Sequence, residues 1–142
     1  MEPSPIIAPV VALVGWSLVM LVWLVASRLP AMKAKGISLK GLVGGRPGAL
    51  DGVIDERAQW KAHNYMHLME QPTLFYAVCF ALALLGRGDG VNLALAWAYV
   101  GLRVAHSLVQ ATVNVILYRF VLFAAASIML ILLTLSAAAA LV

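Results

Sequence analysis

Residues 63–85 read HNYMHLMEQPTLFYAVCFALALL and join a polar half to an apolar half. The half after Pro72 is apolar and typical of a membrane-spanning helix, whereas the half before it carries two histidines, an asparagine and Glu70. An ionisable group at bilayer depth costs about 2.5 kcal/mol or more unless it is paired or hydrated. The stretch therefore predicts a membrane helix with a functional polar site at one end.

The composition of the whole chain indicates an integral membrane protein. Of its 142 residues, 63% are hydrophobic and 11% are charged, whereas a soluble domain has about 25% charged residues. This length fits a single domain, residues 1–142, which we expect to be an all-α, four-helix membrane bundle. The net charge of +4 does not indicate nucleic acid, because basic residues in a membrane protein first report topology.

Four apolar segments are long enough to span a bilayer. We expect the spans at about 6–27, 57–85, 91–113 and 119–142, with a glycine-rich loop at about 28–56. Seven of the ten Lys and Arg residues lie between the first two segments: Arg28, Lys33, Lys35, Lys40, Arg46, Arg57 and Lys61. Positive charge favours the cytoplasmic side, so the loop should be cytoplasmic and both termini non-cytoplasmic. In a bacterium this would be the inner membrane.

Polar residues of the second and third helices form stripes. At about 100° per residue, His63, His67 and Glu70 share one face of the second helix. The third helix aligns Arg103, Ser107 and Gln110, with His106 beside them. Polar stripes in a membrane turn toward each other or toward a neighbouring subunit. We expect Glu70 and Arg103 to neutralise each other's charge.

Two further residues mark the ends of helices. Pro72 lacks an N–H and its ring clashes with the carbonyl of Leu68, so it should bend the second helix beside Glu70. Arg119 begins the last helix, where a guanidinium beside free helix N–H groups could hold an anion. The simpler interpretation is an interfacial arginine that obeys the positive-inside pattern.

Three ordered motifs resemble the MAPEG superfamily, the membrane-associated proteins in eicosanoid and glutathione metabolism. The segment from Asn64 to Tyr76, NYMHLMEQPTLFY, resembles the signature of the family's second helix. The run Arg103-Val104-Ala105-His106 looks like that of the prostaglandin E synthase branch, and Arg119 follows thirteen residues later, at the spacing of that branch's catalytic arginine. The resemblance covers nearly the whole chain.

The resemblance implies a homotrimer that binds glutathione between its subunits and takes a lipophilic substrate from the membrane. Arg119 would stabilise the glutathione thiolate as the catalytic residue, because a neighbouring guanidinium lowers the pKa of a thiol. The remaining candidate cofactor-binding residues are Arg28, Lys61, His63, Asn64, His67, Glu70, Arg103, His106 and Gln110. The leading hypothesis is a glutathione-dependent transferase or peroxidase acting on lipophilic electrophiles.

Departures from the family pattern motivate a second hypothesis. His67 stands where the signature has asparagine, and Gln110 and Phe123 replace tyrosines. The chain could therefore be a non-enzymatic member that binds a lipid, another small molecule or a partner membrane protein. A third hypothesis is a metal site made by His63, His67, Glu70 and His106, since imidazole and carboxylate are common metal ligands.

Overall fold

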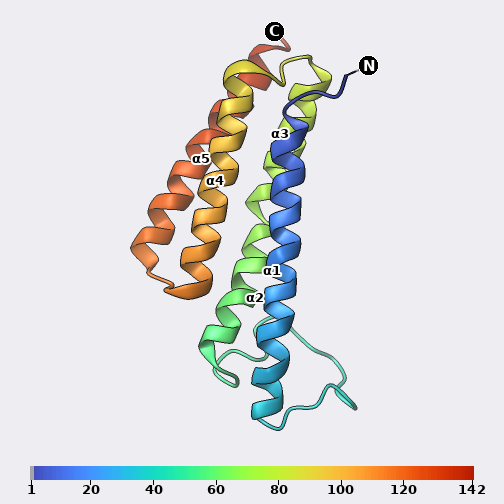
Figure 1. The fold of residues 1–142 in the computed structure, drawn as a ribbon, viewed down its shortest axis with the longest axis vertical. Helices are drawn as coiled ribbons and strands as arrows, with labels where there is room; N and C mark the ends of the chain where they lie inside the picture. Colours follow the sequence, from blue (N-terminus) through green and yellow to red (C-terminus); the bar gives the residue numbers. More distant parts are fainter. Residues whose placement is uncertain (1) are drawn as a thin grey trace.

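The computed structural model describes residues 2–142 and is a bundle of helices that run side by side along one long axis (Figure 1). The helices are α1 (Ile7–Ala34), α2 (Glu56–Leu68), α3 (Gln71–Leu84), α4 (Gly90–Thr112) and α5 (Ile116–Ala139). Because α2 and α3 follow one another as the two halves of one long helix, the expected all-α four-helix bundle is confirmed. Both ends of the chain lie at the same end of the bundle, opposite the long loop (Figure 1).

Helix α1 is longer than the expected span at 6–27, because it continues through Pro30 to Ala34. The extension packs Met32 against Ile54 and Ala58 in a small apolar cluster of its own. This burial stabilises the helical turns after residue 27, at the start of the segment expected to be an irregular or partly helical loop. Helices α1 and α2 consequently extend past the α4–α5 hairpin at the loop end of the bundle (Figure 1).

The expected second span at 57–85 is divided between Leu68 and Gln71. Glu70 has φ −92° and ψ −99°, outside the helical region, and Pro72 lies in the first turn of α3. Proline is accommodated there because the first helical N–H groups need no partner within the helix. The bend expected at Pro72 is thus a full interruption of the helix.

Gln71, the first residue of α3, links α3 to α4 and α5 directly after the break. Its Nε2 donates to Ser127 Oγ of α5 at 2.8 Å, and its Oε1 accepts from the Tyr99 hydroxyl of α4 at 3.2 Å. Tyr99 also stacks on Phe75 with ring centroids 4.3 Å apart. Cys79 lies one helical turn after Phe75 in α3 and is fully buried in the apolar core that contains Phe75 and Tyr99.

The turn between α4 and α5 is short and is set by Asn114. This residue has φ +53°, and its backbone N–H donates to the carbonyl of Val109 at 2.7 Å. A residue in the left-handed region is a common way to end a helix. The last helix therefore begins at Ile116, three residues earlier than expected, and Arg119 lies in its first turn.

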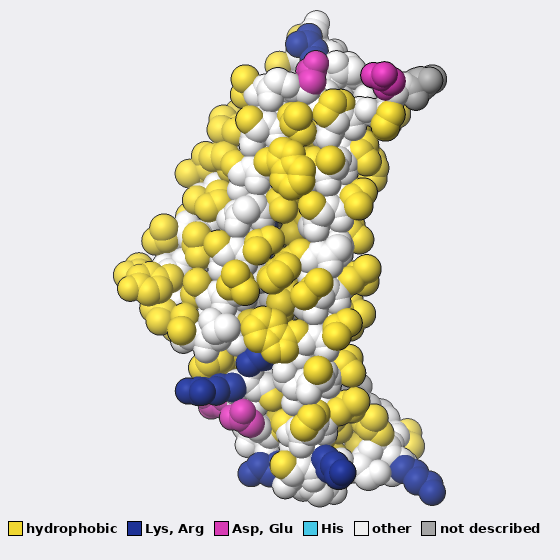
Figure 2. Space-filling view, in the orientation of Figure 1, with side chains coloured by type: hydrophobic (Ala, Val, Ile, Leu, Met, Phe, Trp, Pro, Cys, Tyr) yellow, Lys and Arg dark blue, Asp and Glu magenta, His cyan; other side chains and the backbone are white. Residues whose placement is uncertain are grey.

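The outer surface matches a membrane environment. Figure 2 shows hydrophobic side chains over most of the height of the bundle, with Lys, Arg, Asp and Glu gathered toward its two ends. Helices α1 and α5 are long and apolar enough by themselves to cross a membrane. Helix α4 carries Arg103 and His106 on its buried side, so its polar groups face the bundle.

Candidate functional site

A polar core lies between α2 and α4 at the level of the helix break. Its members are almost completely shielded from solvent: Asn64, Arg103, His106, Ser107 and Gln110. The two predicted polar stripes do turn toward each other, because Arg103 and His106 of α4 both contact His67 of α2. This pairing of stripes confirms the expectation drawn from the helical periodicity.

Arg103 is held by His67. Its Nη2 lies 2.9 Å from Nδ1 of His67 and 3.2 Å from the backbone carbonyl oxygen of the same residue. Because a guanidinium only donates, Nδ1 is the acceptor and the ring proton is on Nε2. The His67 ring also stacks on His106, with centroids 4.9 Å apart, and Phe123 of α5 packs edge-on against it.

The expected neutralisation of Arg103 by Glu70 is wrong. Within residues 2–142 no ion pair joins Arg103 to Glu70, and Glu70 is exposed. The helix break explains the difference, because it turns Glu70 out of the α2 register. Arg103 instead hydrogen-bonds a carbonyl near the C-terminal end of α2, where the helix dipole is negative and favours a cation.

Beside this core lies a pocket of about 320 Å³, which we call the arginine pocket. It is lined by Trp60, His63, Met66, His67, Glu70, Gln110, Asn114 and Arg119. Arg119 Nη1 donates to Asn114 Oδ1 at 2.8 Å, which fixes the guanidinium at the start of α5. Five of the predicted site residues therefore meet here, from α2, the break, α4 and α5.

A second pocket of about 370 Å³, the loop pocket, continues from the first. Its lining residues are Asp51, Gly52, Glu56, Gln59, Trp60, His63 and Asn114. Trp60, His63 and Asn114 line both pockets. Sequence reasoning missed the loop pocket, because the position of Asp51 over α2 depends on how the long loop folds back.

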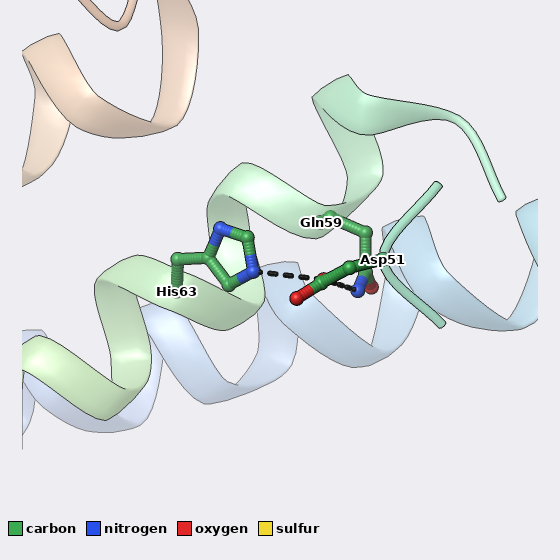
Figure 3. Close-up of polar contacts among 3 residues, drawn as sticks. All are labelled: Asp51, Gln59 and His63. Atoms are coloured by element: carbon green, nitrogen blue, oxygen red, sulfur yellow. Dashed lines mark hydrogen bonds and ion pairs between the residues drawn. The ribbon is translucent and has the colours of Figure 1, made fainter. Parts of the chain in front are cut away.

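Asp51 attaches that loop to α2 (Figure 3). Gln59 Nε2 donates to Asp51 Oδ1 at 2.6 Å, and His63 Nε2 lies 3.0 Å from the same oxygen. These hydrogen bonds from Gln59 and His63 are the main reason that the pKa of Asp51 is lowered, and the charges of His63 and Arg28 act in the same direction. Asp51 therefore remains a carboxylate at neutral pH.

The other predicted residues lie outside the pocket linings. Asn64, Arg103 and His106 are buried behind the arginine pocket. Lys61 donates to the carbonyl of Arg57 at 2.6 Å and lies over the Trp23 ring. Their predicted part in cofactor binding stays a prediction.

Several buried polar atoms of this region have no hydrogen-bond partner among residues 2–142. They include Arg103 Nε and Nη1, His106 Nδ1, Ser107 Oγ, Gln110 Oε1, Arg119 Nε and both amide atoms of Asn64. Buried polar groups are nearly always bonded, so the polar core and Arg119 are where this part of the chain departs from that rule. In the part of the chain described, no three His, Cys, Asp or Glu side chains are arranged to hold a metal ion.

Apolar helices around a buried polar core, with a pocket that opens beside an arginine, are typical of a small integral membrane protein of the all-α class. The chain belongs to the MAPEG family, whose sequence model matches residues 6–139. Comparison with curated proteins and with solved structures gave no match. The family assignment confirms the resemblance seen in the three sequence motifs, and MAPEG proteins are integral to the membrane.

Proposed function

We propose that the protein is a glutathione-dependent transferase or peroxidase that acts on lipophilic electrophiles. The observation that carries this proposal is Arg119, which lines the arginine pocket in the first turn of α5 and is fixed there by Asn114. Membership of the MAPEG family, in which glutathione is a frequent ligand, gives independent support.

The donor set of the pocket fits a tripeptide thiol. Glutathione offers two carboxylates, an ammonium group and a thiol, and the pocket offers cationic Arg119, two histidines and the carboxylate of Glu70. Arg119 Nε and Gln110 Oε1 add a donor and an acceptor without partners in the described chain. A volume of about 320 Å³ lies at the lower end of the range for small-molecule sites, roughly 300–1,000 Å³.

Arg119 would contribute to catalysis through the positive charge of its guanidinium. When bound, glutathione supplies a sulfur nucleophile for an electrophile that arrives from the membrane. The Arg119 guanidinium stabilises negative charge on that sulfur, and the N-terminal end of α5 adds positive potential in the same place. Asn114 keeps the guanidinium oriented before the ligand arrives, so less reorganisation is needed during reaction.

The first test replaces Arg119 by alanine and, as the matched control, by lysine. We expect Arg119→Ala to lower the rate of glutathione conjugation to chlorodinitrobenzene by about 10²-fold, typical for the loss of one stabilising donor. Arg119→Lys should retain part of the rate, because it keeps the charge. Calorimetry measures glutathione binding, and native mass spectrometry measures assembly, which we propose to be a homotrimer in both variants.

Two results would count against this proposal in different ways. Full conjugation activity in Arg119→Ala would remove that residue from the mechanism. Absence of glutathione binding to the wild-type protein at millimolar concentration would defeat the function itself.

An apolar groove motivates the second candidate, a non-enzymatic lipid-binding protein. The groove has a volume of about 410 Å³ and is lined by Leu74, Ala77, Val78, Leu130, Ile131, Thr134 and Leu135 of α3 and α5. Its surface suits an acyl chain as well as a lipophilic electrophile. A stoichiometric lipid in the purified protein, together with a melting temperature that glutathione does not change, would favour this candidate.

A further inference from the structure

His63 occupies the junction of the arginine pocket and the loop pocket, and it lines both. Its side chain is 44% exposed, so a ligand can reach it. Because the Asp51 carboxylate can only accept, Nε2 of His63 carries the proton of their 3.0 Å hydrogen bond. In the neutral ring, Nδ1 is then left with a lone pair, and Figure 3 shows this second ring nitrogen pointing away from Asp51.

The partner of His63 is itself held in place. Asp51 Oδ1 also accepts from Gln59 Nε2 at 2.6 Å, so two side chains of α2 fix one carboxylate oxygen from the loop (Figure 3). Hydrogen bonding from Gln59 and His63 lowers the pKa of Asp51, which keeps it negative over the whole neutral range. A carboxylate in this position orients an imidazole and stabilises the imidazolium that forms when the ring accepts a proton.

We propose that His63, oriented by Asp51, is the general base that takes the proton from a thiol bound beside Arg119. The inference rests on the proposed function and adds to it a second catalytic residue, with Asp51 and Gln59 as positioning residues. His63 and Arg119 both line one pocket of about 320 Å³. A thiol bound in this pocket would therefore lie near both the proposed base and the guanidinium.

The charged and titratable groups around His63 come from every neighbouring element. Asp51 belongs to the loop, Glu56 and His67 to α2, Glu70 to the break and Arg119 to α5, while Arg28 of α1 acts on Asp51. On α4, the pocket is lined by Gln110, which is uncharged. Among these groups, His63 alone combines a free ring nitrogen, an oriented ring and access to the arginine pocket.

The proposed step is a single proton transfer. His63 Nδ1 accepts the proton of the S–H bond, whose electron pair stays on sulfur, and Arg119 stabilises the resulting charge. With chlorodinitrobenzene, a carbon–sulfur bond forms and the carbon–chlorine bond breaks, releasing chloride. The imidazolium then loses its proton to water, which restores the base.

The test compares His63→Gln with the wild-type protein over a range of pH. Glutamine can still donate to Asp51, so the loop attachment is preserved while the base is lost. We expect a fall of about 10²-fold or more in kcat/KM at pH 7, as for the removal of a general base. Activity should approach that of the wild type above about pH 9, where a free thiol with pKa near 8.5 ionises without help. A purely structural loss would show no such recovery.

A second readout needs no electrophile. The ultraviolet difference absorbance of the thiolate in the glutathione complex should be present at pH 7 in the wild type and strongly reduced in His63→Gln. Asp51→Asn should reduce both the absorbance and kcat/KM, because the ring loses its anionic partner. Arg57→Gln is the matched control, since Arg57 is an exposed residue of α2 that lines neither pocket.

The outcomes separate this inference from the proposed function. If His63→Gln binds glutathione and retains the wild-type pH profile and thiolate absorbance, His63 is not the base, and the role of Arg119 is untouched. If calorimetry detects no glutathione binding to the wild-type protein, both proposals are overturned. Reduced activity at every pH in His63→Gln, without recovery in alkali, would assign the residue to structure alone.

Discussion

Asn114 holds a backbone conformation that costs a side-chain-bearing residue about 1–2 kcal/mol, with φ +53°. Asparagine tolerates this region better than most residues, because its short polar side chain forms local hydrogen bonds. Here the side chain accepts from Arg119 Nη1 at 2.8 Å. One residue therefore ends α4, starts the turn to α5 and orients the proposed catalytic guanidinium.

Replacement of Asn114 separates these roles. Asn114→Gly should keep or slightly raise the melting temperature, since glycine adopts positive φ without strain, yet it should lower conjugation about tenfold, because Arg119 loses its partner. Asn114→Ala should lower both, because alanine retains the strain. Thermal unfolding in detergent and kcat/KM measure the two effects, and equal activity of Asn114→Gly and the wild type would show that Arg119 needs no such support.

At the scale of the element, the interruption between α2 and α3 creates the site. The carbonyl of His67, next to the end of α2, accepts from Arg103 Nη2 at 3.2 Å as well as from the backbone N–H of Glu70 at 3.4 Å. The break also places Glu70 at the pocket lining and Gln71 between α4 and α5. Proline in the first turn of α3 keeps the two halves apart.

Arg103 should therefore matter first for stability. Arg103→Met keeps much of the side-chain volume but removes the hydrogen bonds to His67, and we expect it to destabilise the protein by about 1–3 kcal/mol. The matched variant Leu102→Met changes a neighbouring residue of α4 that lies in the partly buried apolar shell. Denaturant unfolding compares the two, and equal stability would mean that α2 ends without help from Arg103.

The periodicity of the sequence was enough to predict polar faces on α2 and α4 that turn toward each other or toward a neighbouring subunit, because a helix fixes side-chain direction at every position. It could not predict that Pro72 would interrupt the helix rather than bend it, nor that Arg103 would bond His67 in place of Glu70. Both depend on tertiary contacts of residues far apart in the chain. Asp51 escaped notice for the same reason, since a glycine-rich loop has no period that places it over α2.

For the whole molecule, the long basic loop and the two termini lie at opposite ends of the bundle (Figure 1). We propose that the loop faces the cytoplasm, because five of the ten Lys and Arg residues fall within residues 28–56. The site would then lie toward the cytoplasmic end, where soluble glutathione can reach it. Lipophilic substrates would approach from the apolar flank shown in Figure 2.

Reporter fusions to the C-terminus test this orientation in a bacterial host. Alkaline phosphatase, which folds only outside the cytoplasm, should be active at this position, and a fluorescent protein that folds in the cytoplasm should be dark. Fusion of the same reporters after Ser38, in the exposed loop, provides the opposite control. Active phosphatase at Ser38, combined with an inactive fusion at the C-terminus, would show that the topology is opposite to the one proposed.

Cys79 is the protein's single cysteine, and its side chain is fully buried in α3. A folded subunit therefore presents no sulfhydryl of its own to an alkylating reagent. In a protein proposed to hold a thiol ligand, the folded polypeptide therefore does not itself react with a thiol reagent. Every equivalent of reagent consumed by the folded complex counts a bound ligand, so a simple titration would give its stoichiometry per subunit without radiolabel or crystal.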